Sequence, residues 1–328
     1  MAALLAGLPD SVPGMTVNRL CGSGLSAVGT AAAMVRSGDA DLVIAGGVES
    51  MTRAPWVMAK PARPWAKPGE VVDSSLGWRF VNPRMPDLDG GQATISLGET
   101  AEEVALLDGV TREECDEWAL RSHTNAVRAA KDGLFDAEIV GVETADGPVL
   151  ADEGPRSDTD LERLARLKPA FRAGGLVTAG NSSSLNDGAA AILVAGPRTV
   201  ERLGLTPRAR VVASTSAGVP PHLMGLGPVP ATEKLLARTG WGAGDFDAVE
   251  LNEAFAAQVI ACRRRLGIPE EVVNADGGAI ALGHPLGASG ARLLVTLLGR
   301  LERSGGRRGL ASMCVGVGQG VSLAVERT

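Results

Sequence analysis

The sequence contains no tyrosine, and aromatic residues make up only 3% of its 328 positions. Stacking platforms for nucleic-acid bases need several exposed rings, so such a surface is not expected. The net charge is −6, and the basic residues are scattered apart from a run of three arginines at 263–265. This pattern lacks the basic footprint of a nucleic-acid-binding protein, so we predict no nucleic-acid partner.

Long hydrophobic runs and metal-binding patterns are also missing. No stretch of 18 apolar residues occurs, so we predict no transmembrane helix and no membrane partner. The N-terminus lacks the basic region of a signal peptide. The four cysteines share no metal-ligand spacing, so no metal site is predicted. We expect a cytoplasmic protein whose reduced thiols are available for chemistry.

What the sequence has in excess is glycine, with 43 residues, alongside 45% apolar residues. This composition is typical of a close-packed α/β protein with many tight turns. The order apolar strand, glycine-rich turn, small-residue helix, apolar strand occurs twice, at 17–50 and at 273–320. Closing strands follow at 190–195 and 321–325. The repeated order predicts two duplicated halves, each with helices packed on a parallel sheet.

Both predicted helices of the repeat have one apolar face. In the first copy it is formed by Leu25, Val28, Ala32 and Val35, and in the second by leucines between 293 and 301. Both helices open with glycine and serine, which favours capping by the serine. The second half has further strands at 209–213 and 246–251 and helices at 232–239 and 256–266.

The first half has few residues before its copy of the repeat. We expect a strand at 15–20, and we expect this half to lack two strands and a helix, so that the chain begins inside a former helix. Between the copy and its closing strand lies an excursion at 51–185, with a helix starting at a capping box on Thr111. The predicted domains are 1–50 plus 186–197, a loop region at 51–185, and 198–328.

Cys21 stands where an apolar segment meets the start of a predicted helix. The helix dipole and unpaired backbone N–H groups favour an anion there, so we expect a stabilised thiolate. The flanking glycines let a substrate carbonyl approach closely. The alternative is a small core cysteine, because free cysteine is among the most buried residue types.

His284 occupies the glycine-rich loop of the second copy that corresponds to the Cys21 loop of the first. Loops related by duplication tend to converge, and a histidine beside a cysteine is the base that a thiol nucleophile needs. The alternative is a histidine that only serves a turn.

Two further strand ends carry chemical groups. Cys314 and Gly316 lie in a Cys-Val-Gly-Val-Gly segment, whose glycines leave backbone N–H groups free to hold an oxyanion. Asn252 also follows a strand, where helix capping is the plain alternative. Cys21, His284, Cys314 and Asn252 are all expected at one sheet edge, where α/β proteins place their sites.

The motifs together are similar to those of the thiolase family. They are NRLCGSG at 18–24, GGVESM at 46–51, TAGN at 178–181, NDGAAA at 186–191, NEAFA at 252–256, GGAIALGHPLGASG at 277–290 and CVGVGQG at 314–320. The match covers essentially the whole chain. It implies an α/β fold of two βαβαβαββ-type halves in α-β-α-β-α layers, the first half lacking N-terminal strands that family members carry.

The resemblance also implies an activity and an assembly. The activity is acyl-CoA C-acyltransfer, with 3-oxoacyl-CoA cleaved by coenzyme A or formed by Claisen condensation. Coenzyme A and acyl-CoA enter as substrates, and no bound cofactor is implied. The assembly is a homodimer or a homotetramer.

The resemblance assigns roles residue by residue. Cys21 matches the acylated nucleophile, His284 its base, and Cys314 the second acid/base at the substrate α-carbon. Asn252 matches the residue that holds a water for one oxyanion hole, and the N–H groups of Cys21 and Gly316 match the second. Ser183, Ala179 and Phe255 match the path of coenzyme A.

Within the family, GWRFVNP at 77–83 resembles the β-ketoadipyl-CoA thiolase branch, whose substrate has a free carboxylate. Arg53, Arg79 or Arg84 could pair with that carboxylate, or could be surface residues. A ketoacyl synthase shares the fold but lacks CVGVGQG. An inactive, truncated CoA-binding remnant is the alternative from another functional class.

Overall fold

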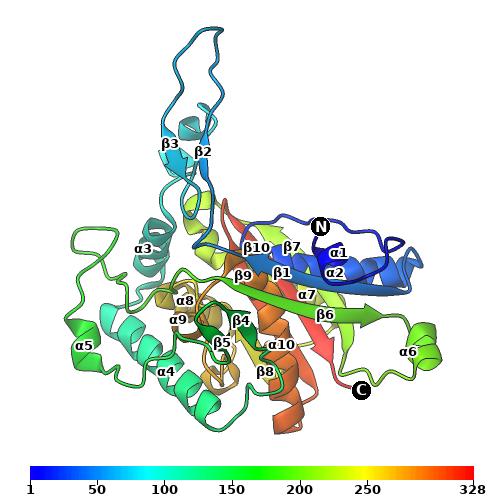
Figure 1. Ribbon diagram of the computed structural model, residues 1–328. Helices are drawn as coiled ribbons and strands as arrows, with labels where there is room; N and C mark the ends of the chain where they lie inside the picture. Colours follow the sequence, from blue (N-terminus) through cyan, green and yellow to red (C-terminus); the bar gives the residue numbers. More distant parts are fainter.

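The computed structural model describes all 328 residues. Its body has two sheets separated by a pair of helices, with further helices on the far side of the larger sheet (Figure 1). The larger sheet has the strand order β7-β10-β9-β8, and the smaller one pairs β1 with β6. The sheet strands are β1 Leu42–Glu49, β6 Gly188–Ala195, β7 Arg210–Gly218, β8 Ala248–Leu251, β9 Arg308–Val315 and β10 Gln319–Glu326.

The helices form two layers that bury the larger sheet on both faces. Helices α2 (Ser23–Ser37) and α10 (Leu286–Ser304) pack on each other between the two sheets, and leucines of α10 join Leu25 and Val28 in one apolar core. Helices α7 (Pro228–Thr239) and α8 (Ala256–Leu266) build a second core on the other face. The predicted α/β class is confirmed, and α8 spans the predicted residues 256–266.

The prediction of parallel sheets is wrong for most strand pairs. Only β8 and β9 run parallel, whereas β1–β6, β7–β10 and β9–β10 are antiparallel. A turn of three residues joins β9 to β10, and so short a connection can only reverse the chain. The closing strand of each half therefore returns antiparallel to its neighbour, and the larger sheet is mixed.

The expected strands that open each repeat are also absent. Residues 15–20 are not a strand, and Val273 forms only an isolated bridge with Val249. The backbone turns left-handed at Leu20 (φ 49°) in the first copy and at Asn274 (φ 46°) in the second. A left-handed residue ends an extended segment, so the chain bends directly before Cys21 in the first copy and ten residues before His284 in the second.

The two predicted serine caps are not formed either. The N-caps of α2 and α10 are Gly22 and Pro285, without side-chain hydrogen bonds. The Ser23 hydroxyl instead accepts from the Arg19 N–H (2.9 Å) and donates to the Leu20 carbonyl (2.7 Å). These bonds stabilise the left-handed bend, so the serine shapes the Cys21 turn and does not cap the helix.

Helices α2 and α10 and strand β1 approach so closely that side chains are excluded between them. A Cβ on Gly24 would lie 2.8 Å from the Gly287 carbonyl oxygen, and one on Gly47 would lie 1.8 Å from it. A Cβ on Gly290 would lie 2.2 Å from the Leu25 nitrogen. Glycine is therefore required at these positions, and the contact brings together the turns that precede α2 and α10.

The excursion forms a cover on one side of this body. Strands β2 (Trp56–Met58) and β3 (Val71–Asp73) form a hairpin that projects far from the body (Figure 1). Helices α3 (Leu97–Asp108) and α4 (Arg112–Lys131) pack on α8, and α4 also contacts the short helix α9 (Ala279–Leu282). The predicted capping box at Thr111 is present.

The remaining elements are small. They are α1 Ala2–Leu5, the hairpin β4 Val142–Thr144 and β5 Gly147–Val149, α5 Leu161–Ala165 and α6 Pro197–Leu203. None of the helices in the structure combines the length and the hydrophobicity that crossing a bilayer requires.

Candidate active site

Cys21 lies directly after the left-handed Leu20, one residue before the N-cap of α2, with 8% of its surface exposed. Burial raises the pKa of its thiol to about 11, although the backbone N–H groups of Gly316 and of Cys21 itself lower that pKa. The expected stabilised thiolate is therefore not what this structure shows, because loss of solvation outweighs the helix terminus. The group at neutral pH is a thiol that needs a base.

His284 is held between α9 and α10 by backbone and side-chain contacts. Its N–H donates to the Ser184 carbonyl (3.3 Å), and its Nδ1 lies 2.6 Å from the Ser289 hydroxyl. Burial, with a smaller effect of the positive charge of Arg292, lowers the pKa of His284 to about 4. The imidazole is thus neutral at physiological pH and able to accept a proton.

Asn252 follows β8 and faces the histidine ring. Its backbone N–H donates to the Ser312 carbonyl on β9 (3.0 Å), and its Nδ2 lies 3.4 Å from Nε2 and 3.5 Å from Nδ1 of His284. Its Oδ1 is buried with no hydrogen-bond donor from the protein. A buried acceptor without a protein donor is suited to accept one from a water or a ligand.

Cys314 lies near the end of β9, with 2% of its surface exposed. Burial raises the pKa of its thiol well above the usual value, and the charge of Cys21 raises it further, so the two sulfurs influence each other electrostatically. Cys314 packs in a small apolar cluster with Met224 and Phe255. The structure therefore buries the second cysteine in an apolar cluster that lies within electrostatic range of the first.

Gly316 begins the turn that joins β9 to β10, and two side chains close on it. A Cβ added there would lie 3.2 Å from both Leu20 Cδ1 and Trp78 Cη2. The next residue, Val317, is left-handed at φ 62°, which is rare for a β-branched residue. The turn is thus held in a strained form in which the Gly316 N–H faces the Cys21 sulfur.

The residues expected along the coenzyme A path lie partly together. The N–H and the hydroxyl of Ser183 both donate to the Ala254 carbonyl (3.1 and 3.2 Å), next to Phe255. The Phe255 ring meets Phe171 edge to face, with centroids 6.1 Å apart. Ala179 is exposed on the same loop as Ser183.

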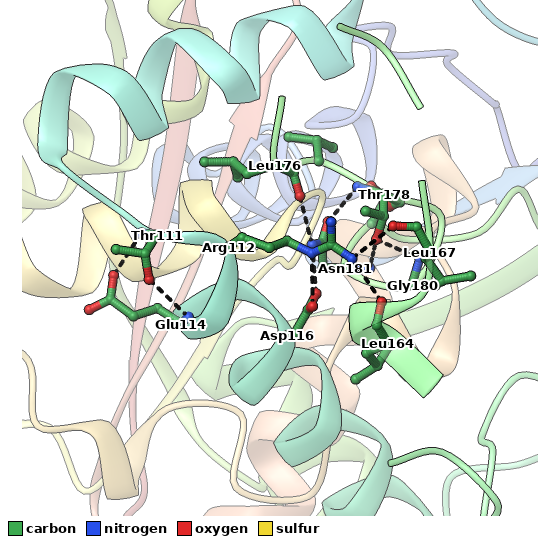
Figure 2. A network of polar contacts seen from close by, with 12 residues as sticks. Thr111, Arg112, Glu114, Asp116, Leu164, Leu167, Leu176, Thr178, Gly180 and Asn181 are labelled. Carbon is green, nitrogen blue, oxygen red and sulfur yellow. Dashed lines mark hydrogen bonds and ion pairs between the residues drawn. The ribbon is translucent and has the colours of Figure 1, made fainter. Parts of the chain in front are cut away.

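A buried polar network fixes this loop onto α4 (Figure 2). The Asn181 amide donates to Asp116 (3.0 Å) and to the Leu176 carbonyl (3.0 Å), and its oxygen accepts from the Thr178 N–H (2.8 Å). Arg112 holds Asp116 at 2.8 Å. The loop that carries Ser183 is therefore tied to the cover, and α4 sets its position.

Sequence reasoning missed two residues of this site. Ser289 positions the His284 ring, and its only sequence signal is its place one helical turn after the histidine loop. Trp78, which covers Gly316 and donates to the Ile95 carbonyl (3.2 Å), gave no such signal, because only the fold brings the excursion to β9. Arg53, Arg79 and Arg84 are exposed, and Arg79 directly follows Trp78.

Comparison with known sequences identifies two matching family descriptions. "Thiolase, N-terminal domain" matches residues 1–197, and "Thiolase, C-terminal domain" matches residues 205–327. The β-ketoadipyl-CoA thiolase of Pseudomonas aeruginosa is 55% identical over 333 residues, covering 100% of this chain and 82% of the relative. The 3-oxoadipyl-CoA/3-oxo-5,6-dehydrosuberyl-CoA thiolase of Escherichia coli K12 is 53% identical with the same coverage.

Solved structures give the same picture. The Bacillus anthracis acetyl-CoA acetyltransferase superposes with a TM-score of 0.91 at 42% identity, over 100% of this chain and 82% of the other. Human mitochondrial 3-ketoacyl-CoA thiolase in complex with CoA superposes with a TM-score of 0.90 at 37% identity, over 99% and 80%.

The high pKa of the buried Cys21 thiol predicts that its alkylation depends on pH in an unusual way. With a thiol pKa of about 11, the thiolate fraction, and hence the rate with iodoacetamide, should rise about tenfold per unit between about pH 7 and pH 10. Mass spectrometry of the Cys21 peptide gives the rate, and the urea-unfolded chain, which should level off near about pH 9.5, is the control. A plateau already below pH 7 would instead reveal a thiolate–imidazolium pair.

Proposed function

The chain belongs to the thiolase family, and we propose that it is a CoA-dependent acyltransferase that cleaves 3-oxoacyl-CoA to acetyl-CoA and a shortened acyl-CoA, or catalyses the reverse condensation. The observation that carries this proposal is that the turns and strand ends carrying two buried thiols, a neutral imidazole and an amide pack against one another. Claisen chemistry needs a nucleophile, its base, an acid/base for the α-carbon, and donors for developing oxyanions.

In the first half-reaction, Cys21 passes its proton to His284 and its sulfur attacks the 3-oxo carbon. The bond between C2 and C3 breaks, and its electron pair stays on C2 as the enolate of acetyl-CoA. Cys314 gives its proton to C2, which leaves Cys314 as a thiolate and Cys21 as an acyl thioester. The strongly raised pKa of Cys314 suits this role, because a high pKa matches a thiol to a weakly acidic C–H.

The second half-reaction restores the enzyme. The thiol of coenzyme A gives its proton to the Cys314 thiolate and attacks the acyl carbon, while Cys21 departs and recovers its proton from His284. Every group then has its starting proton. No bound cofactor enters either step, since coenzyme A and acyl-CoA are substrates.

Two sets of donors serve the two developing oxyanions in this proposal. The N–H groups of Cys21 and Gly316 stabilise the oxygen of the acylated carbon, which is supported by their effect on the Cys21 sulfur. Asn252 holds a water that forms the other site with His284, which is supported by its unpartnered Oδ1 and its 3.4 Å contact with the ring. Ser183, Ala179 and Phe255 then border coenzyme A.

The substrate we propose is 3-oxoadipyl-CoA, in keeping with the names of the bacterial relatives. Of the three candidate arginines, Arg79 is favoured for the free carboxylate, because it directly follows Trp78, whose indole covers Gly316. Its guanidinium donates to the Gly77 carbonyl and forms no salt bridge, so its charge is available to a ligand.

The inactive binding remnant is not favoured, because relatives named as thiolases match the whole chain. In domain terms we propose two thiolase halves, 1–50 plus 186–197 and 198–328, with 51–185 covering the coenzyme A site. The packing of α2 on α10 at the boundary between the halves supports this division.

We also propose that the chain assembles with copies of itself into a homodimer or homotetramer. The outer face of the β1–β6 sheet exposes Ile44 (58%) and Val48 (72%), with Leu193 paired beside Ile44. The projecting β2–β3 hairpin exposes Trp65 fully. Exposed apolar side chains grouped on a sheet face or a projecting hairpin are typical of an interface between protein chains.

Light scattering tests this assembly. We expect the mass of two or four chains, and a shift toward one chain in Ile44→Asp, because a carboxylate cannot be buried unpaired in an apolar contact. The matched control is Leu106→Asp on the exposed surface of α3, which should keep the wild-type mass. A wild-type mass of one chain contradicts the proposal.

The separation of the two cysteine roles gives a direct test of mechanism. Acetyl-CoA should add about 42 Da, one acetyl group, to the Cys21 peptide of both the wild type and Cys314→Ala. Condensation should fall by about 10²–10⁴ in Cys314→Ala, because the acid/base at the α-carbon is lost. Cys115→Ala, which removes a buried thiol on α4, is the control and should keep both activities. An adduct found only on another cysteine refutes the assignment.

The role of Arg79 is tested by comparing two substrates. Arg79→Ala should lower kcat/KM for 3-oxoadipyl-CoA by about 10- to 100-fold, the value of a charged hydrogen bond, and leave acetoacetyl-CoA within about twofold. Arg36→Ala, an exposed arginine on α2, is the control. Equal losses on both substrates, or a loss in Arg84→Ala in place of Arg79→Ala, would show that Arg79 does not read the carboxylate.

A further inference from the structure

Glu253, the residue after Asn252, is a carboxylate with none of its surface exposed. It forms no salt bridge, yet both oxygens are saturated with hydrogen bonds. Its donors are Trp118 Nε1 (3.0 Å) and Asn274 Nδ2 (2.8 Å) on Oε1, and Ser122 Oγ (2.6 Å) and Ile280 N (3.1 Å) on Oε2. Each oxygen thus accepts two hydrogen bonds, which is the arrangement that suits an ionised carboxylate.

These donors come from three separate parts of the chain. Trp118 and Ser122 belong to α4 of the cover, Asn274 to the left-handed bend between α8 and α9, and Ile280 to the first turn of α9. Two members of the network lie close in sequence to residues of the site. Helix α9 ends two residues before His284, and Glu253 itself follows Asn252.

Two of the donors also hold neighbouring backbone. Asn274 accepts from the Leu251 N–H (2.9 Å) and donates to the Leu251 carbonyl (2.8 Å), which fixes the end of β8 just before Asn252. Ser122 accepts from the Gly278 N–H (3.1 Å), which fixes the residue before α9. The same network therefore forms hydrogen bonds to the backbone near Asn252 and to the backbone of the loop that leads to His284.

The loop that leads to His284 packs closely against this network. A Cβ on Gly278 would lie 2.1 Å from the Glu253 carboxyl carbon, and one on Gly277 would lie 2.6 Å from the Ala126 Cβ on α4. The loop that leads to His284 is thus pressed directly onto both Glu253 and α4.

We propose that Glu253 is a positioning residue, which sets the distance between Asn252 and the His284 ring by tying β8, α9 and α4 to one buried anion. It does not touch the substrate. This inference rests on the proposed function, because the geometry that it maintains is that of the water-holding amide and the base. A misplacement of about 1 Å in such a pair can cost about 10²-fold in rate.

The test is Glu253→Gln, which keeps the shape but replaces one acceptor oxygen with a donor. Either amide orientation turns an NH₂ group toward two of the four donors, so the network must rearrange. We expect kcat for thiolysis to fall about 10²-fold with KM for coenzyme A within about twofold, because the acid/base geometry and not coenzyme A binding is lost. The alkylation rate of Cys21 by iodoacetamide should fall as well.

The matched control is Trp118→Phe, which removes one donor to Glu253 and leaves the anion with three. It should keep kcat within about threefold even if its melting temperature drops, since Ser122, Asn274 and Ile280 still tie the carboxylate to α4, β8 and α9, and Ser122 still holds Gly278. A Glu253→Gln enzyme that unfolds more easily but retains kcat and the Cys21 alkylation rate, each per folded molecule, overturns the proposal and leaves Glu253 a purely structural residue.

If Glu253→Gln does not fold, Ser122→Ala carries the test. It removes the donor that links Glu253 to Gly278, and we expect about a tenfold loss in kcat without a change in KM, whereas an unchanged kcat overturns the proposal. Failure of the proposed function has a different signature. The wild type would then cleave no 3-oxoacyl-CoA, while the alkylation rates of the variants would still report on Glu253.

Discussion

The site depends on the exclusion of side chains where α2, α10 and β1 meet. Gly24, Gly47, Gly287 and Gly290 let backbone pack directly on backbone, so the turn that holds Cys21 and the loop that holds His284 emerge side by side from two halves of the chain. A single added methyl group at Gly47 would collide with the Gly287 carbonyl. At these positions only the hydrogen atoms of glycine lie between the two helices. The reactive groups therefore lie together at the end of this contact.

Close packing also sets the electrostatics of the site. It removes water from Cys21, Cys314 and His284. The pKa of each thiol rises and that of the imidazole falls, so the neutral form of each group is favoured. The proton therefore rests on sulfur until a substrate arrives, and the imidazole stays ready to take it. Burial thus keeps the imidazole unprotonated but also lowers its basicity, and it keeps the Cys21 thiol protonated. The backbone N–H groups of Cys21 and Gly316 favour the thiolate and so act against this last effect.

Much of this could be predicted from the sequence, for reasons visible in particular residues. Helix α8 and the capping box of α4 were predicted because they depend on local periodicity and on Thr111 with Glu114. The sheet directions were not predicted, because a strand does not record which neighbour it joins. The structure does not favour the thiolate expected at Cys21, because the helix terminus is visible in the sequence and the depth of burial is not. Trp78 was missed since only tertiary packing brings it to Gly316.

The contact between Trp118 and Glu253 has an optical consequence. Because the chain has no tyrosine, its ultraviolet emission comes from five indoles, and Trp118 is buried (4% exposed) whereas Trp56 and Trp65 are largely in solvent. The Trp118 ring donates to an anion while Arg121 lies 4.9 Å from its centroid. Charges of opposite sign near an indole shift the energy of its excited state. The intrinsic fluorescence of this protein should therefore change when the packing of α4 against the two halves changes.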